Sequence, residues 1–101
     1  MLYCNMRIIA RKTLRLFWER HPDAEQALKA WYHDIVHATW STPNDIRQIY
    51  ATASIIANNR VVFNIRGNHY RLIAEINYQF QQILIRQILT HEEYDRGKWK
   101  S

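Results

Sequence analysis

The apolar residues of this 101-residue chain follow one spacing in its first half and another in its second. Up to about residue 50 they recur every three or four positions, which is typical of helices that lie against a core. From Ser54 onward, β-branched and aromatic residues form short runs divided by polar turns, which is typical of strands. A helical half followed by a strand half favours an α+β fold, with helices covering one face of an antiparallel sheet.

Length and composition leave room for a single domain over residues 1–101, because domains cluster at roughly 100–150 residues. The unbroken apolar runs fall far below the roughly 18 residues that a membrane-spanning helix needs, so we expect a soluble, cytoplasmic protein with no membrane partner. The single cysteine, Cys4, offers neither an internal disulfide nor a cysteine-based zinc site. Since Met6 is itself a candidate initiator, we expect residues 1–5 to be a non-essential extension.

The first half predicts a short strand and two helices. The strand covers Met6–Ala10, and Thr13 is the expected cap of a helix that ends near His21, because the next residue is a proline. A second helix begins with that proline or the following aspartate, and its apolar stripe runs to about Trp40. Residues 41–45 then predict a turn that leads into a short helical piece.

The second half predicts three antiparallel strands joined in sequence order. They cover Arg60–Ile65, His69–Tyr78 and Ile83–Leu89, and Ser54–Ala57 is a candidate addition to the first. The expected architecture is therefore a short N-terminal strand and two helices packed on a three- to four-stranded antiparallel sheet. The charged C-terminal stretch THEEYDRGKWKS predicts a hook or one helical turn at the edge of that sheet.

The first hairpin can be registered from its turn. A two-residue turn at Gly67-Asn68 places Asn64 opposite Arg71 and sends alternate side chains to opposite faces. The side chains expected against the helices are Phe63, Ile65, Tyr70 and Leu72. Those expected on the open face are Asn64, Arg66, His69 and Arg71.

The second hairpin brings the C-terminal residues to the same place. Pairing Tyr78 with Ile83 sets the end of the last strand opposite Arg71, so His91 and Tyr94 emerge beside that arginine. Residues far apart in the sequence thus meet on one polar, concave surface of the sheet.

The charge balance points to a polyanionic partner. The chain carries a net charge of +5, from 14 Lys plus Arg against nine Asp plus Glu. Ten of the 14 basic residues are arginines, whose planar fork matches phosphate. Aromatic residues make up 13% of the chain, and nucleobases stack on aromatic rings.

The polar cluster suits cleavage of RNA through its own 2′-hydroxyl. This reaction needs a group that takes the hydroxyl proton, a cation that holds the phosphate and a group that protonates the leaving 5′-oxygen. Arg71 and Arg66 can supply the cation, and His91 and Tyr94 the proton transfers. Nothing in this chemistry needs a metal or another cofactor.

Several of these side chains also have purely structural interpretations. Arg86, expected opposite Glu75, suits an ion pair on the sheet better than a catalytic role. His69 could be a solvated turn residue, and His91 and Tyr94 could merely cap and pack the C-terminal segment. The histidines at 33 and 37 have the spacing of two metal ligands on a helix, but the Glu and the third ligand of a zinc-protease motif are missing.

A family resemblance rests on three stretches, RIIARKTLRLFWERHPDAEQALKAWYHDIVHATWSTPNDI, NNRVVFNIRGNHYRLIAEINY and IRQILTHEEYD. Together they resemble the HigB-type toxins of bacterial toxin-antitoxin pairs, within the wider RelE-like group. The resemblance covers about residues 6–95, and the combination of VFNIRGNHYRL with THEEYD is its most specific part. It implies a RelE-like α+β fold.

The resemblance also implies an activity and partners. It implies an mRNA endonuclease that enters the ribosomal A site, cuts the message during translation and arrests growth. The implied partner is a HigA-like antitoxin with a helix-turn-helix domain, and operator DNA is bound only by the toxin-antitoxin complex. A noncatalytic RNA- or ribosome-binding protein that uses the same basic face is the alternative.

The resemblance assigns roles to single residues, although it leaves open which group is the acid and which the base. Arg71 matches the sheet arginine that clamps phosphate, and His91 with Tyr94 and Asp95 matches the C-terminal THxEYD site. The residues expected to contact RNA are Asn64, Arg66, Asn68, His69, Arg86, Asp95 and Lys98.

Overall fold

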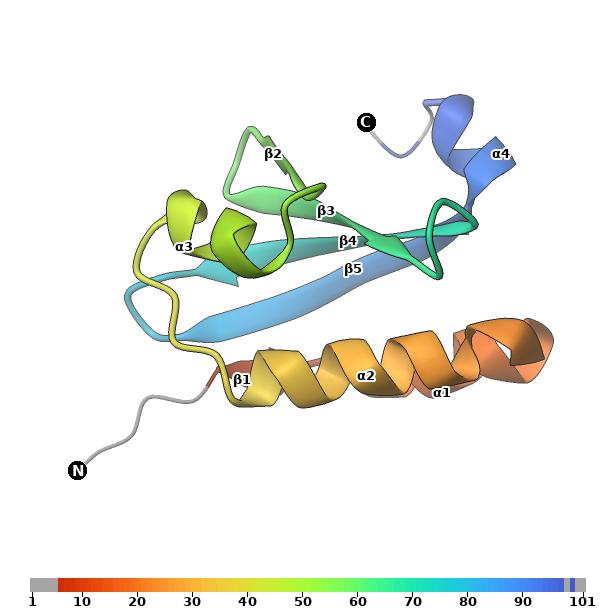
Figure 1. The fold of residues 1–101 in the computed structure, drawn as a ribbon, viewed down its shortest axis with the longest axis horizontal. Helices are drawn as coiled ribbons and strands as arrows, with labels where there is room; N and C mark the ends of the chain where they lie inside the picture. Colours follow the sequence, from red (N-terminus) through yellow and green to blue (C-terminus); the bar gives the residue numbers. More distant parts are fainter. Residues whose placement is uncertain (1–5, 98, 100–101) are drawn as a thin grey trace.

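A computed structural model describes residues 6–97 and residue 99. One five-stranded sheet, with strand order β1-β5-β4-β3-β2, carries α1 and α2 along one face, whereas α4 lies at the far end of the sheet (Figure 1). This is the α+β fold that the change of apolar spacing predicts. The elements are β1 (Arg7–Ile9), α1 (Lys12–Arg20), the 3-10 helix η1 (Pro22–Ala24), α2 (Glu25–Val36), α3 (Pro43–Ile49), β2 (Ser54–Ile56), β3 (Arg60–Ile65), β4 (Tyr70–Asn77), β5 (Gln82–Thr90) and α4 (His91–Asp95).

The sheet is larger and more mixed than expected. Ser54–Ile56 forms its own antiparallel strand beside β3, because the chain reverses at Asn58 and Asn59, which adopt positive φ angles of 65° and 60°. Asparagine tolerates this left-handed conformation better than most residues. At the other edge, β1 pairs in parallel with β5, with Ile8 opposite Ile83. Both edge strands were predicted as elements, and their pairing brings the sheet to five strands instead of the predicted three to four, with one parallel pair.

The helices follow the prediction in type and differ at their ends. The first begins at Lys12, and Thr13 lies inside it rather than capping it. It ends at Arg20, as the following His21-Pro22 pair predicts. The second ends at Val36, four residues before the predicted end at Trp40. Trp40 is nevertheless 2% exposed, because the connecting segment returns over the core.

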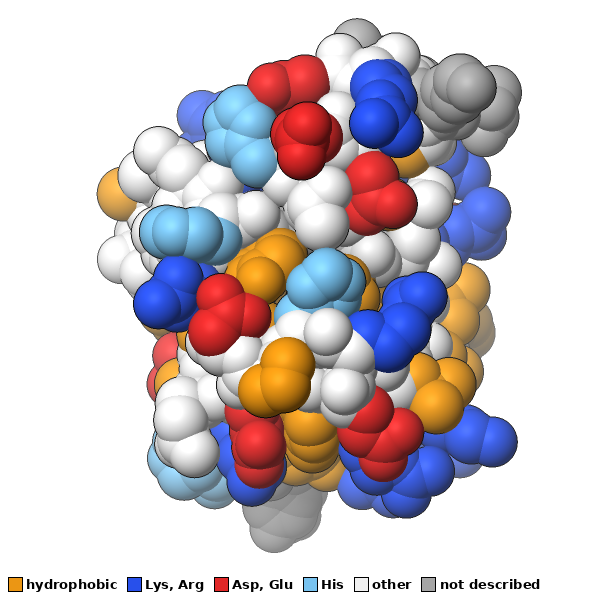
Figure 2. Space-filling model, turned by 90° about the vertical axis from the view of Figure 1, so that its right-hand side faces the viewer, with side chains coloured by type: hydrophobic (Ala, Val, Ile, Leu, Met, Phe, Trp, Pro, Cys, Tyr) orange, Lys and Arg blue, Asp and Glu red, His pale blue; other side chains and the backbone are white. Residues whose placement is uncertain are grey.

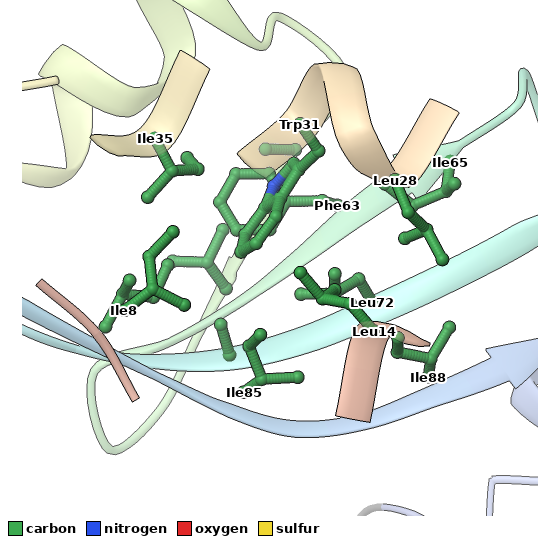
Figure 3. Packing of buried hydrophobic residues seen from close by; sticks show 14 of the residues in the cluster. Ile8, Leu14, Leu28, Trp31, Ile35, Phe63, Ile65, Leu72, Ile85 and Ile88 are labelled. Carbon is green, nitrogen blue, oxygen red and sulfur yellow. The ribbon is translucent and has the colours of Figure 1, made fainter. Parts of the chain in front are cut away.

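The main core lies between the helices and one face of the sheet. The four side chains expected there, Phe63, Ile65, Tyr70 and Leu72, are all buried, which confirms the predicted buried face of the first hairpin. Figure 3 shows Trp31 of α2 directed toward Phe63. The Phe63 ring lies 5.5 Å from the Trp31 ring, and further aromatic rings from the α2–α3 segment surround it.

The first hairpin has the predicted register, whereas the second does not. Arg71 lies opposite Asn64 as expected. In the second hairpin, however, Ile83 pairs with Ile76 instead of Tyr78, and a bulge makes Arg86 an extra residue without a partner position in β4. The bulge shifts the rest of β5 by one residue, so that Leu89 lies opposite Arg71.

The face of the sheet turned away from the helices carries a second, smaller cluster. Val62 and Ile73 lie under Trp99, and Leu89 and Tyr94 pack against them. The C-terminal segment therefore folds back over this face and covers part of the surface that was expected to be open. Within residues 6–97 and 99, no helix is long and apolar enough to cross a membrane.

Candidate active site

Arg71, near the start of β4, is held by the turn that precedes it. One of its Nη atoms donates a hydrogen bond to the Asn68 carbonyl oxygen at 2.9 Å. Its guanidinium carbon lies 5.2 Å from the centre of the Tyr94 ring, within the range of a cation–π contact. The turn and the ring together hold the guanidinium, while its other N–H groups can still bind a phosphate.

Helix α4 lies beside this arginine. It begins at His91 because Thr90 and Glu93 form a reciprocal cap. The Glu93 amide donates to the Thr90 hydroxyl at 3.2 Å, and the Thr90 amide donates to the Glu93 carboxylate at 2.9 Å. The backbone also joins α4 to the first hairpin, since the His91 amide donates to the His69 carbonyl oxygen at 3.1 Å. These bonds fix where the side chains of α4 lie relative to β4.

His91 and Asp95 face each other across one turn of α4. Nδ1 of the imidazole lies 2.9 Å from a carboxylate oxygen of Asp95, and the two side chains are 50% and 59% exposed. When Nδ1 carries the ring proton, it donates a hydrogen bond to the carboxylate. Nε2 can then accept a proton from a substrate. The pair is thus chemically suited to proton transfer at an exposed site.

A cleft of about 620 Å³ lies between the first hairpin and α4. Its lining is formed by Asn68, His69, Tyr70, Thr90, His91 and Glu92. Figure 2 shows this end of the molecule, where histidine side chains lie among both acidic and basic ones. The structure therefore brings Asn68 and His69 of the turn beside His91, whereas Arg71 and Tyr94 contact each other outside this lining.

Arg66 does not lie on the open face as predicted. It adopts a positive φ of 52° at the turn, and this conformation breaks the alternation of the strand. Its side chain instead contacts Asp23 of η1 at 3.4 Å. The arginine is turned toward the helix layer, away from the position expected for an RNA-facing cation.

Asp23 is a residue that sequence analysis missed at this end of the molecule. Its carboxylate accepts a hydrogen bond from the Tyr70 hydroxyl at 2.7 Å and also contacts Arg66. The bond from Tyr70, together with the positive charge of Arg66, holds the pKa of Asp23 below its ordinary value. The same bond raises the pKa of the Tyr70 hydroxyl. The carboxylate thus ties both ends of the β3–β4 turn to the helices.

Arg86 lies apart from these residues. Its guanidinium contacts Glu75 at 3.3 Å, which confirms the ion pair, and Arg60 contacts the same carboxylate at 4.0 Å. Glu75 is four residues along β4 from Arg71, a span of about 13 Å in a strand. The structure therefore does not bring Arg86 into the cleft.

The remaining predicted residues are placed as follows. Asn64 is half-buried directly opposite Arg71. Lys98, and the predicted extension over residues 1–5 with Cys4, lie outside the described residues. Trp99 was missed, although a large aromatic in an otherwise charged stretch was an available signal.

A second hollow, of about 600 Å³, lies between α1 and α2 and has a different chemistry. Its lining is mostly basic and aromatic and contains no histidine or carboxylate. The lining residues are Ala10, Arg11, Lys12, Leu14, Arg15, Trp18, Lys29 and Tyr32. The cleft at α4, which contains histidines, is the better candidate for proton-transfer chemistry.

Histidines 33 and 37 also lie close together, with ring centres 4.6 Å apart. Nδ1 of His37 is hydrogen-bonded to the carbonyl oxygen of His33 at 2.8 Å. In the part of the chain that the structure describes, no group of three or more His, Cys, Asp or Glu side chains is arranged to hold a metal ion.

Comparison with known proteins places this chain in a family. The family model for the HigB toxin, the RelE-like toxic component of a toxin-antitoxin system, matches residues 24–97. The chain belongs to the HigB toxin family. The HigB family match contains Arg71, His91 and Tyr94, whereas β1, α1 and Trp99 lie outside it.

Relatives of the HigB family align with most of the chain. The mRNA interferase toxin HigB of Escherichia coli (strain K12) is 27% identical over 92 residues, which cover 89% of this chain and 88% of that protein. The mRNA interferase HigB of Escherichia coli O6:H1 (strain CFT073) is 28% identical over 93 residues, which cover 90% of each.

Proposed function

We propose that this chain is an mRNA endonuclease that cuts translated message in the ribosomal A site and so arrests growth. The observation that carries the proposal is the convergence of a held arginine, a histidine–carboxylate pair and a tyrosine at one end of the sheet. These are the three kinds of group that 2′-hydroxyl attack requires, which supports the proposal. The names of the relatives as mRNA interferases support RNA as the substrate.

In the proposed reaction the RNA supplies its own nucleophile. Nε2 of His91 takes the proton from the 2′-hydroxyl, and the negative charge of Asp95 stabilises the imidazolium that forms. The 2′-oxygen attacks the adjacent phosphorus while Arg71 binds the phosphate oxygens. The bond from phosphorus to the 5′-oxygen breaks, and Tyr94 protonates that oxygen. The products are a 2′,3′-cyclic phosphate and a free 5′-hydroxyl.

The other RNA contacts follow from the same cleft. Asn68 and His69 line it beside His91. We infer that they contact a base next to the cut phosphate. Asn64 lies opposite Arg71 and extends the polar surface. Asp95 is better suited to holding His91 than to RNA contact, because a carboxylate repels phosphate. Arg86 and Lys98 remain predictions as more distant phosphate contacts.

The proposal includes a protein partner. Membership of a toxin-antitoxin family implies an antitoxin, and we propose that it is a HigA-like helix-turn-helix protein. Operator DNA is then contacted through the antitoxin in the complex.

Primer extension on a message that is being translated in a purified system tests the activity. Wild type is compared with His91→Ala and Tyr94→Phe, and each is also tested on the same RNA without ribosomes. Cuts that need ribosomes and disappear in both variants are the expected result. A folded wild type that makes no cuts would identify the chain as a noncatalytic RNA or ribosome binder.

A further inference from the structure

Trp99 is a buried aromatic residue that the proposed reaction does not use. It is 8% exposed and lies on Val62 and Ile73, on the face of the sheet turned away from α1 and α2. The family match ends at residue 97, so this side chain lies beyond the part that defines the family.

Two contacts connect Trp99 to Tyr94. The two rings are stacked, with centres 4.8 Å apart and planes inclined by 12°. The indole Nε1 donates a hydrogen bond to the Tyr94 carbonyl oxygen at 2.8 Å. Since the Arg71 guanidinium also lies on the Tyr94 ring, one tyrosine side chain contacts both the phosphate-binding arginine and the tryptophan.

Helix α4 needs such a contact. It has five residues, none of which is buried, and a helix this short is unstable without tertiary packing. The cap formed by Thr90 and Glu93 fixes its first turn only. At its other end, Gly97 has a positive φ of 76° and its amide donates to the Tyr94 carbonyl oxygen, so the chain reverses toward the sheet.

We propose that Trp99 is a positioning residue for the RNA-cleaving site. Trp99 holds Tyr94 against the face of the sheet turned away from α1 and α2, and it thereby fixes the position of the Tyr94 hydroxyl relative to Arg71. The inference rests on the proposed function, because it concerns the geometry of that same site. The residues that shape the site then extend to residue 99, beyond the family match.

An aromatic ring stacked on Tyr94 is what the proposal requires. Trp99→Phe keeps an aromatic ring on Tyr94 and loses the indole hydrogen bond. Trp99→Leu and Trp99→Met keep an apolar side chain over Val62 and Ile73 and remove the stacked ring. If burial alone mattered, the two aliphatic variants would behave like the phenylalanine variant.

The kinetic test measures single-turnover cleavage of a ribosome-bound message over a range of toxin concentrations. A displacement of about 1 Å in a catalytic group can cost on the order of 100-fold in rate. We expect Trp99→Leu and Trp99→Met to lower the saturating rate by roughly 10- to 100-fold while the half-saturating concentration stays unchanged. Trp99→Phe is expected to restore most of that rate.

Val62→Ala is the matched control, because it weakens the same small cluster without removing a ring from Tyr94. Thermal unfolding is recorded for every variant. We expect Val62→Ala to lower the melting temperature and to keep the cleavage rate. Equal losses of rate in Val62→Ala and Trp99→Leu at equal losses of stability would overturn the proposal, and so would wild-type cleavage by Trp99→Leu.

Proton NMR provides a readout that does not depend on activity. The ring current of Trp99 shifts the ring protons of Tyr94, so Trp99→Leu is expected to move these resonances while those of Phe63 in the main core stay in place. Unmoved Tyr94 resonances would overturn the inference. If wild type cuts no message and yet the resonances move, the proposed function fails while the contact between Trp99 and Tyr94 stands.

Discussion

The imidazole Nδ1 of His91 lies 2.9 Å from a carboxylate oxygen of Asp95, one turn further along α4. Both residues come from the stretch THEEYD, and a spacing of four on a helix places the two side chains on the same face. The contact holds the ring in one orientation. The contact supports the proposed role of Asp95 in holding His91, which sequence alone did not distinguish from RNA binding.

Asp95→Asn is expected to lower the rate of ribosome-dependent cleavage by about 10- to 100-fold, because the amide keeps the size of the side chain and loses the charge that stabilises the imidazolium. Single-turnover primer extension measures the loss. Glu19→Gln removes an equal charge from the exposed surface of α1, away from the cleft, and is expected to retain activity. Equal activity in the two variants would assign the His91–Asp95 contact to helix stability alone.

Arg71→Ala is expected to abolish growth arrest while changing the free energy of unfolding by less than about 1 kcal/mol, since Arg71 packs over the sheet outside the main core. Arg71→Lys is expected to recover little, because lysine lacks the planar fork that binds phosphate and the turn carbonyl together. Growth on induction and thermal unfolding are measured side by side. A variant that loses its thermal transition would show that Arg71 is structural.

Asp23→Asn is expected to lower the melting temperature at neutral pH, because the ionised carboxylate binds the Tyr70 hydroxyl and Arg66. Folding lowers the pKa of Asp23 from 3.8, so its stabilising effect is present above that value and is lost as the pH falls through the lower folded value. The difference between wild type and variant should therefore shrink below pH 3.8.

Melting temperatures from about pH 7 down to about pH 3 test this sign. Glu19→Gln is the control, because its carboxylate pairs with the exposed Arg15, at 3.9 Å. A constant difference for Asp23→Asn at every pH would argue against the ionised Asp23 contact.

Phe63→Ala is expected to destabilise the fold by about 3–5 kcal/mol, because the ring is fully buried among the aromatic side chains of the core. Phe80→Ala is the matched control, since Phe80 is 65% exposed in the β4–β5 loop and its loss leaves no cavity. Urea unfolding measures both. Equal midpoints for the two variants would contradict the core described here.

The division of the sheet into two faces was predictable from sequence, because it depends on alternation and on the Gly67-Asn68 turn. Both signals are local, and the register of Asn64 with Arg71 follows from them. The neighbouring register was not predictable in the same way. The bulge at Arg86 has no compositional signature, yet it shifts every later pair of β5 by one residue.

The candidate site was predictable in its members and less so in their contacts. Arg71 and the α4 residues converge as expected, because strand order brings the end of β5 beside the start of β4. Arg66 escaped the prediction because its positive φ overrides strand alternation. The contact of Trp99 with Tyr94 depends on a chain reversal at Gly97, and such a reversal cannot be oriented from residue types alone.

The parallel pairing of β1 with β5 has a consequence for how the molecule is made. Arg7–Ile9 leaves the ribosome early, but its partner strand is translated only after the helices and the first two hairpin strands. The edge strand β1 can therefore pair only late during synthesis, after β5 is made. Helix α4 follows β5 directly and is positioned later still. A nascent chain that stops short of β5 lacks both the pairing partner of β1 and the His91–Asp95 pair.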